Sequence, residues 1–347
     1  MKALELDHVS YRYPSEDFDI IDDLSFSVER GSFHCIVGVS GCGKSTIFRL
    51  TNGLLKPKSG VIRVEGKPIV GQKHYCGYMP QKDLLFPWRT IGENLALPLE
   101  IMGGYSKAQR RELVDAALAD TGLTGSRDKR PEELSGGMRQ RAAFARTMLT
   151  GSDLLLLDEP FSALDSHLRF RLEQEVREII RDFGKTVMLV SHDRDEVFRL
   201  SDRIAVISDG KVETFGSKAA VFAQPQTKNA AILTGCKNIS PIERLGPRRV
   251  RAVDWGMELD TASDVGDALS AGIRMHDVRP GPGENSFLCD VTSVIENPFS
   301  FTVMLRPVGS EGAVPLGWEM EKAQWNALRA ERLEIHLPSE AIVLLRG

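Results

Sequence analysis

Cysteine is scarce in this sequence and shows no pairing pattern. The chain has five cysteines, an odd number, widely spaced and without a CxxC pair. A disulfide framework needs an even set, and a structural zinc site needs ligands at close and regular spacing. The sequence therefore predicts neither and favours buried or incidental thiols.

Long apolar runs are missing as well. No stretch approaches the ~18 consecutive apolar residues of a membrane-spanning helix, and residues 1–10 lack the apolar core and cleavage site of a secretory signal. We therefore expect a chain that stays in the cytosol.

Neither sign of charge dominates. Lys and Arg number 44 and Asp and Glu number 48, which gives a net charge of −4 and an isoelectric point near 6.0. Without an overall basic field there is no electrostatic driver for nonspecific nucleic-acid binding. With 42% hydrophobic and 27% charged residues, the composition is that of an ordinary folded protein and excludes disordered and fibrous classes.

Length and pattern predict two domains. The 347 residues correspond to about two domains of ~150 residues each. Residues 1–225 alternate short apolar runs with helical patterns, which predicts an α/β domain. Residues 235–347 carry short alternating segments with Gly and Pro, which predict a small β-barrel-like domain after a linker at 226–234. The expected elements are strands at 33–39, 154–157, 186–190 and 204–207, surface helices at 106–121 and 168–183, and a helix near 319–332.

Residues 38–45, GVSGCGKS, match the phosphate-binding pattern G-x-x-x-x-G-K-[ST] between a predicted strand and a predicted helix. Glycines let several N–H groups point inward, and the helix N-terminus adds partial positive charge. Lys44 is expected to neutralise the β- and γ-phosphates of a bound nucleotide, and Ser45 to hold Mg²⁺. The predicted nucleotide contacts are Gly38, Ser40, Gly41, Cys42, Gly43, Lys44, Ser45 and Thr46.

The apolar run at 154–157 ends in two acids, Asp158 and Glu159. A strand buried on both faces delivers such carboxylates to the carboxyl edge of a parallel sheet, where ligands of open α/β folds bind. We expect Asp158 to accept from the Mg²⁺ shell and Glu159 to polarise the attacking water. An acidic pair in a solvated turn is the alternative, which the phosphate loop upstream disfavours.

Four more motifs occur in a fixed order: MPQ at 79–81, LSGGM at 134–138, SALD at 162–165 and SH at 191–192. Together they resemble the Q-loop, signature, D-loop and switch histidine of the ATP-binding-cassette (ABC) ATPases, over residues 1–225. Met138 stands where the family usually has Gln. Because the phosphate-facing parts of that motif are its serine and glycine backbone, activity is expected to survive this departure.

The resemblance implies an α/β P-loop NTPase domain with a mixed sheet and a helical subdomain, and an ATP site shared by two copies. Each ATP would lie between Lys44 of one copy and the signature of the other. One P-loop per chain implies a homodimer or a pairing with a related ATPase subunit. The nucleotide contacts from this side would be Ser135, Gly136 and Gly137 of the signature and Asp165 of the D-loop.

The resemblance also assigns roles around the phosphates. Glu159 would be the general base, His192 would hold the γ-phosphate, and Gln81 would complete the Mg²⁺ ligands with Ser45 and Asp158, partly through water. A further residue, Tyr13, matches the aromatic that stacks on adenine. Tyr11 competes with it for that role, and packing in a core is the alternative for either ring.

Residues 82–99 are too apolar and aromatic for a free loop. In the family this region receives a helix of a membrane permease, which makes Phe86, Pro87 and Trp88 candidate contacts; packing within the domain is the alternative. The implied partners are permease subunits and, through them, an external solute-binding protein, without nucleic acid. The chain would then be peripheral on the cytoplasmic face of the inner membrane.

Three C-terminal segments carry a second resemblance: TGCKNIS at 234–240, GIRMHDVRP at 272–280 and VIENPF at 294–299. They resemble TOBE, an OB-like accessory domain of bacterial importers, and are most similar to those for molybdate or tungstate. By contrast, residues 80–99 and LSGGM are more similar to nitrate, sulfonate and taurine importers, so the two halves disagree about the cargo. Both groups import small oxyanions, which is the cargo class that the resemblances imply. Arg274, His276 and Arg279 could converge on an anion, although alternating charges on a β-segment usually form its solvent-exposed face. The remaining alternatives are a non-transport ABC ATPase and an oxyanion-sensing regulator.

Overall fold

Strands that are buried along their whole length form the centre of the first part of the chain. β3 (Phe33–Val37), β7 (Leu154–Asp158) and β8 (Thr186–Val190) are buried at every position and pair in parallel. Since both faces of these strands are covered, their sequences are continuous apolar runs without polar alternation. The strands expected at these places are confirmed.

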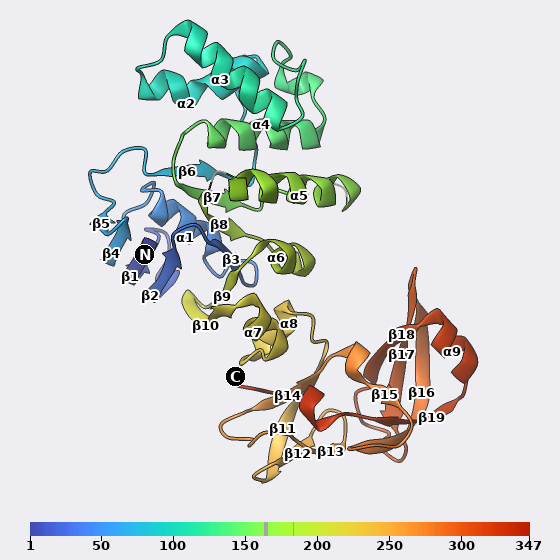
Figure 1. Ribbon diagram of the computed structural model, residues 1–347. Coiled ribbons are helices and arrows are strands. Elements are labelled where there is room, and N and C mark those ends of the chain that lie inside the picture. Colours follow the sequence, from blue (N-terminus) through green and yellow to red (C-terminus); the bar gives the residue numbers. More distant parts are fainter. Residues whose placement is uncertain (163–165, 183) are drawn as a thin grey trace. The chain divides into compact units, whose positions relative to one another are not determined.

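The computed structural model describes residues 1–162, 166–182 and 184–347, in two units, Met1–Lys218 and Ala219–Gly347 (Figure 1). In unit 1 the sheet orders are β10-β9-β3-β8-β7-β6 and β2-β1-β4-β5. The other strands of unit 1 are β1 (Lys2–Tyr11), β2 (Ile21–Glu29), β4 (Ser59–Val64), β5 (Lys67–Pro68), β6 (Cys76–Met79), β9 (Arg203–Ser208) and β10 (Lys211–Ser217).

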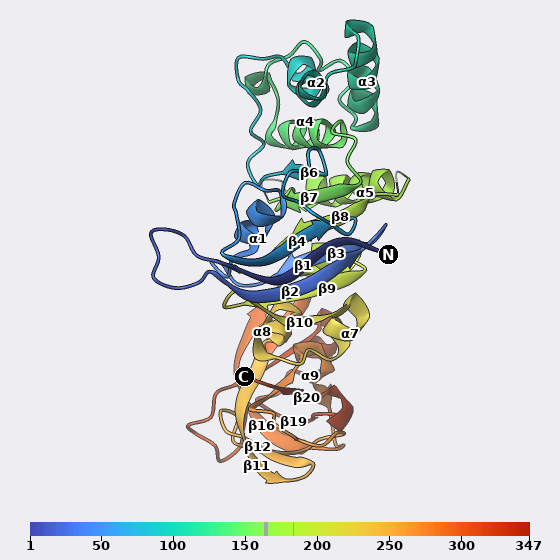
Figure 2. The same cartoon turned by 90° about the vertical axis from the view of Figure 1, so that its left-hand side faces the viewer.

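The helices at one end of unit 1 have a core of their own. Figure 2 shows three of them gathered beyond β6: α2 (Ile91–Met102), α3 (Lys107–Asp120) and α4 (Gly136–Met148). Leu95 and Val114 lie in the buried cluster between them. α2 and α3 each begin at a capping box, in which a hydroxyl and a side chain three residues on satisfy the free N–H groups. The remaining helices of unit 1 are α1 (Lys44–Thr51), α5 (Ser166–Asp182) and α6 (Arg194–Leu200).

The parallel strands bring distant segments to one edge. β3, β8, β7 and β6 are neighbours running in the same direction, so the residues that follow each of them meet at their shared carboxyl edge. These are the phosphate loop after β3, Gln81 after β6, Glu159 after β7 and His192 after β8.

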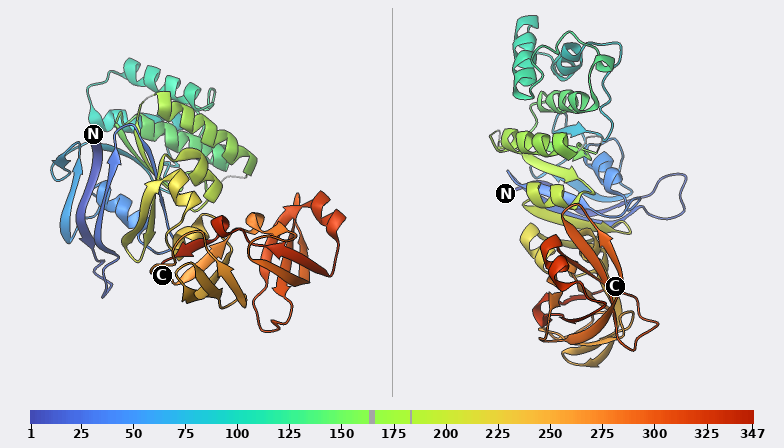
Figure 3. Two further views of the ribbon diagram at one scale, coloured as in Figure 1. Left: turned by 60° about the horizontal axis from the view of Figure 1, so that its bottom comes forward. Right: turned by 90° about the vertical axis from the view of Figure 1, so that its right-hand side faces the viewer.

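Unit 2 begins with two short helices, α7 (Lys218–Ala223, whose first residue belongs to unit 1) and α8 (Lys228–Leu233). α8 occupies the stretch 226–234 that the sequence suggested as a linker. Two sheets follow, in the orders β13-β12-β11-β14-β20 and β15-β19-β16-β17-β18 (Figure 3). Their strands are β11 (Asn238–Gly246), β12 (Arg249–Ala252), β13 (Met257–Asp260), β14 (Ser270–Ile273), β15 (Arg279–Pro280), β16 (Ser286–Glu296), β17 (Ser300–Pro307), β18 (Leu316–Glu321), β19 (Arg332–His336) and β20 (Val343–Leu345).

A buried amide ties the two sheets of unit 2 together. Asn238 of β11 donates to the carbonyl oxygen of Gly317 in β18 at 2.7 Å, and its own side-chain oxygen accepts from the Gly317 N–H at 2.8 Å. Beyond β18, α9 (Lys322–Leu328) packs Trp325 against Phe301 of β17, with ring centres 6.4 Å apart. The expected fold class is confirmed: an α/β domain with a P-loop, then a β-rich domain with a curled, half-barrel sheet.

In the part of the chain that the structure describes, no helix has both the length and the apolar character needed to cross a membrane. All five cysteines are free thiols, and four of them are buried.

Candidate functional site

The loop between β3 and α1 requires glycine at several positions. Gly41 and Gly43 have φ of 85° and 101°, a left-handed region that residues with a Cβ rarely adopt. At Gly38, a Cβ would lie 2.4 Å from the carbonyl oxygen of Ile207 on β9. A tight, glycine-rich turn that leads directly into a helix N-terminus is the geometry that cradles phosphate.

Lys44, the first residue of α1, is buried within this loop. Its ammonium donates hydrogen bonds to the carbonyl oxygens of Gly38 and Val39, at 2.9 and 2.8 Å. Both acceptors belong to the loop itself, so the positive charge lies against the backbone that would surround a phosphate. A buried cation at a helix N-terminus favours a polyanionic ligand.

Next to the lysine, a hydroxyl meets a carboxylate. Ser45 Oγ donates to Asp158 Oδ1 at 3.3 Å, and the Tyr78 hydroxyl donates to Asp158 Oδ2 at 3.5 Å. Burial is the main cause that raises the pKa of Asp158 above its ordinary value. A hard cation prefers oxygen ligands of this kind, so Ser45 and Asp158 fit a Mg²⁺ ion, which would also favour the ionised form of this buried carboxylate.

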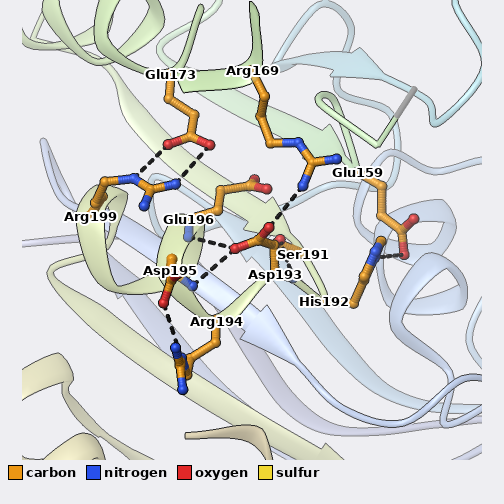
Figure 4. Close-up of polar contacts among 10 residues, drawn as sticks. All are labelled: Glu159, Arg169, Glu173, Ser191, His192, Asp193, Arg194, Asp195, Glu196 and Arg199. Carbon is orange, nitrogen blue, oxygen red and sulfur yellow. Dashed lines mark hydrogen bonds and ion pairs between the residues drawn. The ribbon is translucent and has the colours of Figure 1, made fainter. Parts of the chain in front are cut away.

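Three side chains from three strand ends meet at Glu159. Gln81 Nε2 donates to Glu159 Oε2 at 2.8 Å, and His192 Nδ1 lies 3.4 Å from Glu159 Oε1 (Figure 4). The structure thus brings together the residues that the sequence proposed as general base, Q-loop glutamine and switch histidine. A carboxylate flanked by an amide and an imidazole is arranged to hold and orient a water molecule.

Glu159 itself has a strained backbone. Its φ is 48°, which costs on the order of 1–3 kcal/mol for a residue with a side chain. Its N–H donates to the Val190 carbonyl at 2.9 Å, and its carbonyl accepts from Ser162 N and Oγ at 3.2 and 2.9 Å. Surrounding structure therefore enforces this conformation, as is frequent at functional sites.

The two N-terminal tyrosines lie in different environments. Tyr11 is 8% exposed and belongs to the core. Tyr13 is half-buried; its hydroxyl lies 3.2 Å from Thr46 Oγ1 of α1, and its ring meets Tyr11 edge-on at 4.9 Å. Of the two rings, Tyr13 is therefore the one hydrogen-bonded to the helix that follows the phosphate loop.

The signature serine stands apart from the phosphate loop of its own chain. Within the described residues, the hydrogen bonds of Ser135 stay inside α4: its Oγ accepts from Met138 N at 3.3 Å and its carbonyl from Arg139 N at 3.0 Å. Gly136 and Gly137 form the first turn of this helix. A single chain does not join the two proposed halves of the ATP site.

α4 is instead tied to the segment after β6. Arg139 Nε lies 3.2 Å from Asp83 Oδ2, and Gln140 Nε2 donates to the Gln81 carbonyl at 3.4 Å. Arg146 donates to the Asp83 carbonyl at 2.7 Å. The helix that carries the signature is thus bound to the loop that carries the Q-loop glutamine.

Some expected site residues are not brought together. Asp165 lies outside the described residues. In unit 2, Arg274 donates to the Phe222 carbonyl, and His276, which is exposed, lies 3.8 Å from Asp277. Arg279 is exposed on β15. No contact joins the three C-terminal residues in the described part of unit 2, so the expected convergence on an anion is not seen.

A charged cluster beside His192 was missed in the sequence (Figure 4). Asp193 pairs with Arg169 at 2.8 Å, and Glu173, fully buried, pairs with Arg199 at 2.7 Å. Glu196 lies between the two pairs in the view of Figure 4. The sequence did contain a signal for one member of this cluster. An Asp followed three residues later by a Glu is typical of a helix start, and Asp193, three residues before Glu196, caps α6.

Comparisons with known proteins agree on one family. A family model described as "ABC transporter" matches residues 21–162. The chain is 38% identical over 309 residues to a protein of Chromobacterium violaceum named sulfate/thiosulfate import ATP-binding protein CysA 2, covering 86% of this chain and 82% of that protein. It is 35% identical to the nitrate import ATP-binding protein NrtD of Synechococcus elongatus, covering 66% and 85% respectively.

Other relatives are named for the import of a different kind of solute. The spermidine/putrescine import ATP-binding protein PotA of Pseudomonas aeruginosa is 36% identical, with 72% of this chain and 69% of that protein covered. Among solved structures, a dimeric post-hydrolysis state of the ATP-binding cassette MJ0796 bound to ADP and Pi is similar with a TM-score of 0.57 and 29% identity. This similarity covers 62% of this chain and 98% of that one.

The buried acid Glu196 generates a pH prediction. Burial is the main cause that raises its pKa to about 8, helped by the nearby charges of Glu173 and Asp193 and opposed by the Ser191 hydroxyl and Arg169. Below pH ~4.5 this residue is protonated in both folded and unfolded chains. As the pH rises toward 8, only the unfolded chain loses the proton, so folding stability falls.

We therefore expect Glu196→Gln, which cannot ionise, to raise the melting temperature at pH 8–9 by at least about 2–4 °C, with the difference shrinking toward pH 5. Thermal unfolding monitored by circular dichroism across this range provides the measurement. Glu178→Gln, an exposed substitution on the same helix as Glu173, is the control. A difference for Glu196→Gln that is constant with pH would contradict the prediction.

Proposed function

The chain belongs to the ABC transporter family of ATP-binding proteins, and we propose that it is the ATP-hydrolysing subunit of a bacterial importer. It is an ABC transporter ATPase, and the three relatives described above are named import proteins. The observation that carries the proposal is the single sheet edge at which the phosphate loop, the Ser45–Asp158 pair and the Gln81–Glu159–His192 group meet. Such a subunit would couple ATP hydrolysis to separate permease chains, which form the path of the solute through the membrane.

At this edge each residue has a proposed task. Lys44 exchanges its carbonyl partners for the β- and γ-phosphates of ATP, while Ser45, Asp158 and Gln81 hold Mg²⁺, partly through water. When bound, that ion draws charge from the phosphate oxygens. Glu159 accepts a proton from the attacking water, and His192 holds the γ-phosphate on the same side.

The second half of the site comes from another chain. Ser135, Gly136 and Gly137 of a second copy, or of a related ATPase subunit, would close over the ATP bound at Lys44, with Asp165 at the same interface. Two observations support this: Ser135 bonds only within its own helix in the described chain, and the similar MJ0796 cassette is dimeric with ADP and Pi. Tyr13, hydrogen-bonded to Thr46 of α1, would stack on the adenine.

Glu159→Gln is expected to bind ATP and to lower turnover by ~10²–10⁴, because the amide keeps the shape of the carboxylate but cannot take the proton. Phosphate release measures turnover, and a fluorescent nucleotide measures binding. With saturating ATP and Mg²⁺ the variant is expected to accumulate as a dimer in light scattering. Normal turnover in the variant would contradict the role of Glu159 as general base. A variant that stays monomeric with ATP and Mg²⁺ would contradict an ATP site shared by two chains. Glu178→Gln is the control.

An apolar groove supports a docked permease. It has a volume of about 650 Å³, and its lining includes Leu84, Phe86 and Ile101. Beside it Trp88 is 69% exposed and stacks on Phe86 at 5.0 Å. Asn94, fully buried, fixes this loop by accepting from Phe86 N at 2.7 Å and donating to the Phe86 carbonyl at 3.1 Å. A rigid, exposed apolar surface of this kind marks a partner site.

Trp88→Ala is expected to weaken retention of the permease by about 10-fold or more, as removal of an interface aromatic typically does, without changing the ATPase rate of the isolated subunit. Co-purification with membranes that contain the permease provides the measurement. Phe299→Ala, which removes another exposed aromatic, 90% exposed in unit 2, is the matched control. Equal retention of both variants would exclude the Trp88 loop as the docking site. A lower melting temperature of Trp88→Ala would favour the alternative, in which Trp88 packs within its own domain.

For the cargo we propose a small oxyanion, delivered by an external solute-binding protein, with the subunit held on the cytoplasmic side of the inner membrane by its permease. The match to the sulfate/thiosulfate protein extends over 309 residues and so reaches beyond unit 1, which ends at Lys218. The nitrate protein supports the same class. The polyamine proteins make an organic cation the competing cargo.

Reconstituted vesicles that contain this chain, its permease and its binding protein test the cargo. ATP-driven uptake of labelled sulfate, nitrate or molybdate is expected, with no uptake of spermidine. Uptake of spermidine alone would overturn the oxyanion class while leaving the importer intact. Vesicles with Glu159→Gln are the control for uptake that does not depend on hydrolysis.

A further inference from the structure

The carboxylate of Asp193, the residue after His192, uses both of its oxygens. Oδ1 accepts from the N–H groups of Asp195 and Glu196, both at 3.0 Å, and so caps α6. Oδ2 accepts from Arg169 Nη1 at 2.8 Å. The Asp193 N–H in turn donates to Ser191 Oγ at 3.0 Å. The whole connection from β8 to α6 is therefore organised around one side chain.

Little else fixes His192. Its side chain is 64% exposed, and its interaction within the described residues is the 3.4 Å contact with Glu159. An exposed ring is placed mainly by the backbone that carries it. On one side Ser191 N donates to the Ile36 carbonyl at 3.4 Å, and on the other the backbone is held by Asp193. The position of the imidazole thus depends on how firmly Asp193 is held.

Arg169 holds Asp193 from a different helix. It lies in the first turns of α5, and its side chain is 24% exposed, against 29% for Asp193. A partly buried pair with a direct charge-assisted hydrogen bond is less screened by water than a surface pair. Arg169 also follows the D-loop motif by four residues in the sequence. It therefore links the segment after the D-loop to the segment around the switch histidine.

The neighbouring pair offers a natural comparison. Glu173 and Arg199 join the same two helices, through two hydrogen bonds of 2.7 and 3.1 Å. Glu173 is fully buried, so this pair matters for holding α5 to α6. In the described structure its hydrogen bonds do not reach residues 191–193. Of the two arginines that join α5 to α6, Arg169 is thus hydrogen-bonded to the switch histidine loop and Arg199 is not (Figure 4).

We propose that Arg169 is a positioning residue for ATP hydrolysis, which through Asp193 keeps the His192 ring beside Glu159. This inference rests on the proposed roles of Glu159 and His192. It assigns Arg169 no contact with nucleotide. Its loss is expected to slow the chemical step and leave ATP affinity intact.

The test compares Arg169→Met with Arg199→Met in the full chain. Arg169→Met is expected to lower kcat by about 10- to 100-fold, in line with the effect of small misplacements of catalytic groups, with the KM for ATP unchanged. Arg169→Lys, which retains the charge, is expected to recover part of the loss. Arg199→Met is expected to lower the melting temperature and leave kcat near the wild-type value. Equal losses of kcat in the two methionine variants would overturn the proposal.

A double-mutant cycle with His192→Ala separates the inference from its premise. If Arg169 acts through His192, Arg169→Met adds little further loss in the His192→Ala background, whereas independent effects would multiply. Multiplied losses would therefore overturn the role of Arg169. Normal turnover in His192→Ala alone would instead overturn the proposed role of the histidine. Should Arg169→Met fail to fold, Asp193→Asn replaces it, because it keeps an oxygen for the α6 cap and removes the charge that Arg169 binds.

Discussion

The parallel pairing of β7 with β8 sets the position of Glu159 relative to His192. Asp158 lies opposite Val190 in this register, and the bond from Glu159 N to the Val190 carbonyl extends the ladder one residue past the strand. Because of that extra bond, the glutamate and the switch histidine leave the sheet side by side. A slip of one residue would exchange the two faces of the strand and break the bond from Glu159 N to the Val190 carbonyl.

The register also explains why the charged cluster lies where it does. β8 must end at the sheet edge so that His192 can approach Glu159, and α6 must begin almost at once. A helix that starts so close to a strand needs its free N–H groups satisfied locally, which Asp193 does. The remaining oxygen of that carboxylate then provides an attachment point for α5. Packing of the two helices and placement of the histidine are therefore linked through one side chain.

Sequence patterns predicted the parts of this protein that follow local rules. Continuous apolar runs gave the buried strands, and the glycine spacing of residues 38–45 gave the phosphate loop. Other features depend on contacts between distant segments and had no local signal. The resemblance favoured Tyr13 over Tyr11, but the hydrogen bond of Tyr13 to Thr46 depends on how α1 packs. The positive φ of Glu159 depends on Val190 and Ser162. In unit 2, Arg274 donates to the carbonyl of Phe222, a partner that the charge pattern does not indicate.

The two hydrogen bonds from Lys44 to the Gly38 and Val39 carbonyls have a consequence for the free-energy cost of binding a phosphate. They tie the ammonium to the backbone of its own loop, so that side chain and loop form one hydrogen-bonded unit. Contact of the ammonium with a phosphate then needs the rotation of one side chain, without the ordering of a whole segment, so little conformational entropy is lost.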